Sequence, residues 1–279
     1  MVQGSALVLG GGGVTGIAWE IGLLAGLREA GLDLSAAELL VGTSAGAAVA
    51  AQLASDIPLA TLFELQLTGS AQEIPARLGP ALLARFVWNM LTQRELAGYG
   101  RAMGRVALSA RTVDEAERLA AIASRLPSHE WPERLVRITA VNALSGAFRV
   151  FERADGVALV DAVAASCAVP GVWPPVSIGG ERWIDGGMRS AVNADLAAGR
   201  ARVVILAPIT GGGGAVPTVG RQVEALRAAG SAVVLVSPDR AARSQMGRNV
   251  LDPSKRAAAA EAGKLQALRE LDRVAAVWR

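Results

Sequence analysis

The central segment of this sequence is Leu39-Leu40-Val41-Gly42-Thr43-Ser44-Ala45-Gly46-Ala47-Ala48. It begins with an apolar run typical of a buried strand and ends in small residues suited to a helix. Between them lies G-x-S-x-G, a pattern that places serine on a sharp, strained turn from strand to helix. The segment therefore predicts that Ser44 presents its hydroxyl at such a turn, as a candidate nucleophile. The alternative is an ordinary turn with Ser44 as a helix N-cap, which is a common use of serine.

A glycine run, Gly10-Gly11-Gly12-Gly13-Val14-Thr15-Gly16, connects an apolar strand pattern at 5–9 to a helical pattern at 17–30. It satisfies the dinucleotide-binding spacing G-x-G-x-x-G, but no acidic residue closes the next strand to hold a ribose. A P-loop is excluded because Ile17 stands where the lysine is required. Consecutive glycines at a helix N-terminus do expose backbone N–H groups to an anion that develops during a reaction. The run thus predicts an oxyanion-binding loop, with a tight connection without chemistry as the alternative.

Composition favours a large apolar core, because 52% of the 279 residues are hydrophobic and 19% are charged. The net charge of +3 comes mostly from scattered arginines, without the polybasic block that nucleic-acid binding would need. We therefore expect no nucleic acid as partner, while a transient contact with anionic membrane surfaces stays open.

Processing and redox signals are sparse. No apolar run reaches the ~18 residues of a membrane span, and the N-terminus lacks the positive region of a signal peptide. These features predict a cytoplasmic protein. Cys167 is the single cysteine, which excludes an intramolecular disulfide and a CxxC metal site, and we expect it to be buried.

The order of elements predicts an α/β fold in a single domain over residues 1–279. Buried strands are expected at 5–9, 39–41, 202–208 and 232–236, with a crossover helix at 222–229 and a long amphipathic helix at 253–278. A hairpin at 135–142 and 147–151 and a short strand at 181–184 complete the pattern.

A helical, cap-like segment at about 58–125 interrupts these strands. Its expected helices are 59–67, 82–96 and 113–123, with breaks at Gly69-Ser70, Gly79-Pro80 and Gly98-Tyr99-Gly100. The apolar cluster Phe86, Trp88, Met90 and Leu91 either packs inward, as such clusters usually do, or covers a substrate cleft.

The histidine count restricts the mechanism that Ser44 can use. A serine hydroxyl needs a base to take its proton, and the usual base is histidine. His129 is the single histidine and lies between Pro127 and Pro132, in a loop expected at the surface. The Ser–acid–His chain order of α/β-hydrolases fails because no histidine follows Asp185. We therefore expect a carboxylate to act directly, and Asp185 is the candidate because two glycines follow it.

Taken together, Gly10–Gly16, Gly42–Gly46, Ala165–Val176 and Asp185–Gly187 resemble the patatin-like phospholipase family, in the family's order. The resemblance implies a three-layer α/β/α fold with a mainly parallel sheet and a Ser–Asp dyad acting on acyl esters or lipids. It assigns Ser44 as nucleophile, Asp185 as base and the N–H groups around Gly11, Gly12 and Gly13 as oxyanion hole. It implies neither a metal nor a cofactor for this chemistry.

One position departs from the family pattern. The glycine loop usually carries Arg or Lys just before its last glycine, where this sequence has Thr15. A cation there could orient the loop or meet a phosphate. Three activities therefore stay open: acyl-ester hydrolysis, acyl transfer by the same dyad, and lipid binding by a catalytically weak relative.

Overall fold

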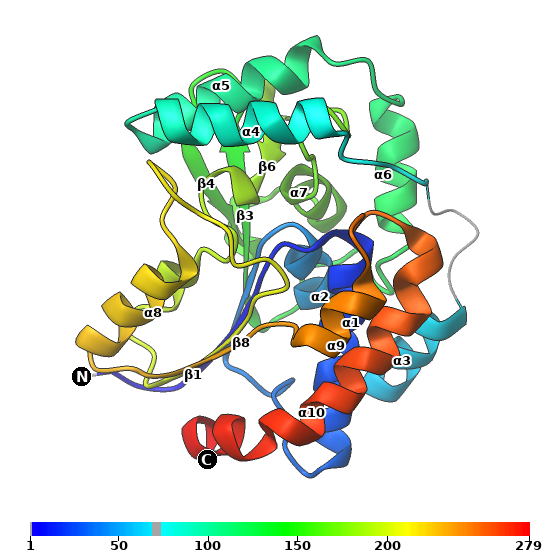
Figure 1. Cartoon of the computed structure of the whole chain (residues 1–279), viewed down its shortest axis with the longest axis vertical. Coiled ribbons are helices and arrows are strands. Elements are labelled where there is room, and N and C mark those ends of the chain that lie inside the picture. Colours follow the sequence, from blue (N-terminus) through cyan, green and yellow to red (C-terminus); the bar gives the residue numbers. More distant parts are fainter. Residues whose placement is uncertain (1, 69–73) are drawn as a thin grey trace.

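An eight-stranded sheet forms the centre of the computed structural model, which describes residues 2–68 and 74–279 (Figure 1). The strands are β1 (Ser5–Leu9), β2 (Leu39–Gly42), β3 (Leu135–Asn142), β4 (Phe148–Phe151), β5 (Val176–Ile178), β6 (Glu181–Asp185), β7 (Arg202–Leu206) and β8 (Ala232–Val236). Hydrogen-bonded neighbours follow the path β5-β6-β3-β2-β1-β7-β8, and β4 also pairs with β3. The run from β3 to β8 is parallel, whereas β4 and β6 are antiparallel to β3 and β5 is antiparallel to β6. The predicted mainly parallel sheet and its hairpin are confirmed.

Helices cover the sheet and one of its ends. The α-helices are α1 (Gly13–Glu29), α2 (Ala45–Leu53), α3 (Leu59–Thr68), α4 (Pro80–Thr92), α5 (Leu96–Ser109), α6 (Glu115–Ala123), α7 (Leu159–Ser166), α8 (Val219–Ala228), α9 (Arg240–Met246) and α10 (Arg256–Trp278). Short 3₁₀ helices are η1 (Arg153–Asp155), η2 (Gly186–Met188), η3 (Ala194–Ala197) and η4 (Pro253–Lys255). Within residues 2–68 and 74–279, we find no helix with both the length and the hydropathy of a membrane-spanning segment.

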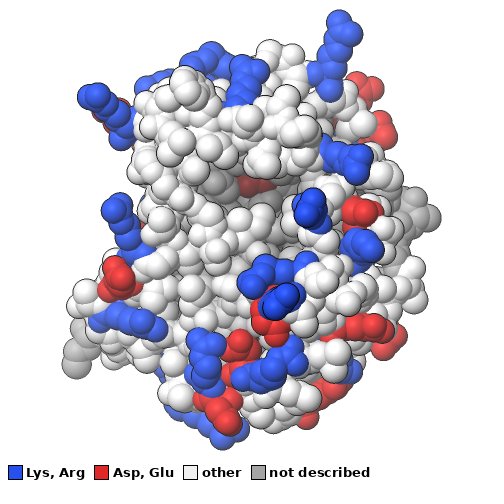
Figure 2. Space-filling model, viewed as in Figure 1, with Lys and Arg blue, Asp and Glu red and all other residues white. Residues whose placement is uncertain are grey.

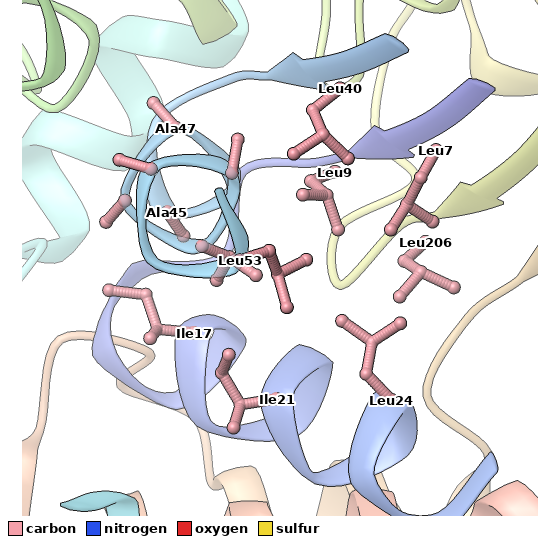
Figure 3. Close-up of a cluster of buried hydrophobic side chains, with 14 of the residues drawn as sticks. Leu7, Leu9, Ile17, Ile21, Leu24, Leu40, Ala45, Ala47, Leu53 and Leu206 are labelled. Atoms are coloured by element: carbon pink, nitrogen blue, oxygen red, sulfur yellow. The ribbon is translucent and has the colours of Figure 1, made fainter. Parts of the chain in front are cut away.

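Alternating side chains of the strands create two hydrophobic cores, one on each face of the sheet. Leu7 and Leu9 of β1 point to one face, where they meet Ile21 and Leu24 of α1 (Figure 3). Helices α2, α7 and α10 contribute to the same core. Ala6 and Val8 point to the opposite face.

On that opposite face, side chains of β7 and β8 pack against η3 and against Val219, Val223 and Leu226 of α8. The molecule thus has a layer of helices on each side of one sheet. This arrangement is the three-layer α/β/α fold that the resemblance implied.

The segment between β2 and β3 is helical, as predicted, but its internal breaks differ. Helix α4 ends at Thr92, and the predicted break Gly98-Tyr99-Gly100 lies inside α5. These glycines permit close packing: a Cβ on Gly100 would lie 2.9 Å from the Gly146 Cα. The predicted break at Gly69-Ser70 lies outside the described residues.

Candidate active site

Ser44 follows β2 on a strained turn. Its φ of 54° is positive, which is rare for a residue other than glycine, and its side chain makes no N-cap hydrogen bond. The turn is pressed against β1, because a Cβ on Gly46 would lie 2.1 Å from the Leu9 carbonyl oxygen. The Gly46 N–H donates to the Gly10 carbonyl, 3.0 Å away. These features match the nucleophile elbow and leave the Ser44 hydroxyl available for other contacts.

The strand order brings Asp185 to the same place. The first half of β3 pairs with β2, its end pairs with β6, and β4 occupies the other edge over both regions. Strands β2 and β6 therefore lie end to end along one edge of β3, with their carboxyl ends facing each other. Gly42 pairs with Ile138 and Asp185 with Ala140, only two residues further along β3. A serine just beyond β2 and an acid at the end of β6 must then be neighbours.

The Asp185 carboxyl accepts a hydrogen bond from the Gly187 N–H, with an Oδ1 to N distance of 2.7 Å, and the Ser44 side chain lies close enough to lower the pKa of this carboxyl. Asp185 is buried. Loss of hydration raises its pKa to about 7, while the Ser44 side chain, the hydrogen bond from Gly187 and the charge of Arg118 act in the opposite direction. A carboxyl with a pKa near neutrality is suited to accepting and returning a proton.

The glycine loop lies beside Ser44, but its N–H groups are not equivalent. The Gly11 N–H donates to the Ala191 carbonyl at 2.8 Å, so Gly11 is not an available donor, contrary to the sequence-based assignment. Among the described residues, no acceptor is found for the N–H groups of Gly12 and Gly13, which lie at the N-terminus of α1. Gly13 has a φ of 60°, and a Cβ there would lie 2.5 Å from the Val250 carbonyl oxygen.

Glu20 of α1 holds the glycine loop through a buried hydrogen bond. It is fully buried in α1, and its Oε1 accepts the Gly10 N–H at 3.0 Å. Burial raises the pKa of Glu20 well above its usual range, which outweighs the opposing effect of that hydrogen bond. The loop thus rests on a carboxyl group that is buried inside the protein.

A buried amide joins the two strand ends. The Asn193 Nδ2 donates to Thr43 Oγ1 at 3.0 Å, beside Ser44, and to the Gly186 carbonyl at 3.3 Å, beside Asp185. It also contacts Thr139 Oγ1 of β3 at 3.3 Å. Asn193 therefore fixes the position of the nucleophile relative to the acid. The sequence analysis missed it, and the only local signal is its place eight residues after Asp185.

Ser44, Asp185 and the glycines at 11–13 line a cavity of about 340 Å³. Its walls are mostly apolar, with Ile17, Phe86, Met90 and Met188 among them, and Figure 2 shows the hollow with acidic atoms inside it. Arg118 and Arg125 also line it. The cavity therefore surrounds Ser44 mainly with apolar side chains.

The sequence analysis did not predict the two arginines of the cavity, and Arg118 lies in a segment, E-A-E-R, that is typical of a solvated helix surface. Arg118 is buried, and its guanidinium carbon lies 3.8 Å from the centre of the Trp173 ring. Thr15, by contrast, does not line the cavity. It is fully buried, and its N–H donates to the Val250 carbonyl at 3.1 Å. The Thr15 side chain therefore contributes nothing to the wall of this cavity.

The remaining candidates behave as expected. His129 is exposed, contacts the Ala123 carbonyl through Nε2 at 3.1 Å and does not line the cavity. Cys167 is buried, and its thiol donates to the Ser44 carbonyl at 3.1 Å. Burial, reinforced by the charge of Asp185, raises the pKa of this thiol to about 12, so it is not a nucleophile at neutral pH.

Comparison with known proteins gives a family match. Residues 7–198 match the model of the patatin-like phospholipases. Two solved structures are similar: VipD from Legionella pneumophila, with 15% identity and a TM-score of 0.49, and the type III effector ExoU, with 16% identity and a TM-score of 0.43. The alignments cover 97% and 98% of this chain but 67% of VipD and 53% of ExoU. No curated protein matches the sequence.

Proposed function

Because this chain belongs to the patatin-like phospholipases, a family of lipid acyl hydrolases, we propose that it is a serine acyl-ester hydrolase with a Ser44–Asp185 dyad. The observation that supports this most is the pairing of Ser44 with the buried Asp185 carboxyl, which the strand register brings together on the wall of one cavity. It joins a strained nucleophile turn to an acid whose pKa lies near neutrality, at the wall of an apolar cavity.

The reaction would proceed in two halves. Asp185 takes the Ser44 proton as Oγ attacks the ester carbonyl, and the oxygen that becomes negative meets the N–H groups of Gly12 and Gly13. Asp185 then protonates the leaving alcohol, and an acyl-enzyme remains. Water, activated by the same carboxylate, attacks the acyl-enzyme and regenerates Ser44. Acyl transfer would differ only in the final acceptor, and a binding protein would form no acyl-enzyme.

Covalent labelling tests the nucleophile. A fluorophosphonate probe should form an adduct on Ser44, located by peptide mass spectrometry, and Ser44→Ala should lose both labelling and ester hydrolysis. Ser124→Ala is the control, because Ser124 is exposed and does not line the cavity. An adduct on a different serine would refute the assignment. A panel of phospholipid, glyceride and thioester donors, with and without an added alcohol, then identifies the acyl donor and acceptor.

A further inference from the structure

Helix α4 presents an unusual outer surface. None of its residues is buried, and Leu83, Val87, Trp88 and Leu91 are between 42% and 68% exposed. The opposite side of the helix, with Leu82, Phe86 and Met90, packs against the cluster around α5. The exposed apolar side chains therefore belong to a helix that is already fixed through its other face.

The charge on this part of the molecule is mainly positive. Residues 74–113, which include α4 and α5, contain six arginines and one acid, Glu95, which gives a net charge of +5. The rest of the chain then carries −2. The arginines, all exposed, are Arg77, Arg85, Arg94, Arg101, Arg105 and Arg111. In Figure 2 the surface where Figure 1 places α4 and α5 is mostly white and blue.

The apolar surface of α4 continues into the active-site cavity. Leu83 and Val87 are exposed and also line the cavity, as does Ile209, which is 42% exposed. A molecule leaving an apolar phase at α4 would therefore reach Ser44 along apolar side chains, without first crossing a polar rim.

We infer that α4 and α5 form a docking surface for membranes that contain anionic lipids. The inference rests on the proposed function, since the cavity would take its acyl donor from the surface that α4 contacts. Tryptophan and arginine are the side chains that suit the boundary between acyl chains and headgroups. A second copy of the chain fits less well, because it would place two surfaces of net charge +5 against each other.

Vesicle binding tests the docking surface without requiring activity. The Ser44→Ala chain is mixed with vesicles of phosphatidylcholine, either alone or with roughly 30 mol % phosphatidylglycerol, and bound protein is separated by flotation. We expect binding to the anionic vesicles that weakens with salt, and little binding to the neutral ones. Trp88→Ser with Leu91→Ser should weaken binding at least about tenfold.

The matched control is Leu265→Ser with Leu268→Ser, two leucines of α10 that are 62% and 65% exposed. It should bind like the parent chain. Equal binding to both vesicle types, equal loss in the control, or no binding at all would overturn the proposal. So would self-association without vesicles that Trp88→Ser with Leu91→Ser abolishes.

Hydrolysis of a water-soluble ester separates this inference from the proposed function. With Ser44 present, Trp88→Ser with Leu91→Ser should keep the parent's rate on that ester, because neither side chain lines the cavity. A double variant that lost the soluble-ester activity would contradict a docking role. Absence of hydrolysis in the parent chain, with vesicle binding intact, would refute only the proposed reaction.

Discussion

The two sides of the active-site cavity differ in how they are held. On one side lie Ser44, Asp185 and the glycine loop, all at strand ends and joined by buried hydrogen bonds through Asn193 and Glu20. On the other side lies α4, which has no buried residue and contacts the protein through one apolar stripe. The strand ends are therefore built for precise geometry, whereas α4 is built for contact with other molecules. Substitutions on the two sides should affect different measurements.

The largest effect is expected at Asp185. Asp185→Asn preserves the shape of the side chain but cannot accept the Ser44 proton, so kcat should fall by about 10²–10⁴. His129→Ala, at the exposed histidine, should retain most of the parent's activity. Both variants are compared on one soluble ester. An inactive His129→Ala beside an active Asp185→Asn would require a histidine-based mechanism instead.

The next effect concerns the oxyanion loop. Gly13→Ala should lower kcat by roughly 10²–10³ with a smaller change in KM, because the donors act mainly in the transition state. The added methyl would meet the Val250 carbonyl, so the loop must shift. Gly220→Ala is the control, since a Cβ there meets nothing within 4 Å. A rise in KM alone would move the oxyanion hole to another loop.

The smallest effect concerns Arg118 and appears only in the pH profile. Asp185 acts as a base when ionised, so kcat/KM should rise with pH and level off above the Asp185 pKa of about 7. Arg118 lowers that pKa, so Arg118→Met should move the acid limb to higher pH. Arg125→Met serves as control, because Arg125 lines the cavity but does not figure among the causes that shift the Asp185 pKa. Superimposable profiles for parent and Arg118→Met would contradict this electrostatic role.

How much the sequence predicts depends on whether a residue's role is local. Ser44 and Asp185 could be selected from the sequence because each follows a strand pattern and has a glycine within the next two residues. Gly100 was misjudged as part of a break because its role, close contact with the backbone of Gly146, depends on a residue distant in the sequence. The same holds for Asn193 and Arg118, since nothing in their neighbours reveals that these polar side chains are buried. The N–H group of Gly11, which the sequence analysis assigned to the oxyanion hole, donates instead to the carbonyl of Ala191, 180 residues away in the sequence.

The burial of Asp185 links the reaction rate to the place where the protein works. An anionic bilayer with a surface potential of about −30 mV concentrates protons roughly threefold at its surface. A carboxyl with a pKa of about 7 responds to that local concentration, not to the bulk value. On anionic vesicles the acid limb of the activity should therefore lie about half a pH unit higher, on the bulk scale, than on neutral ones. The lipid that attracts the protein would in this way also restrain its turnover.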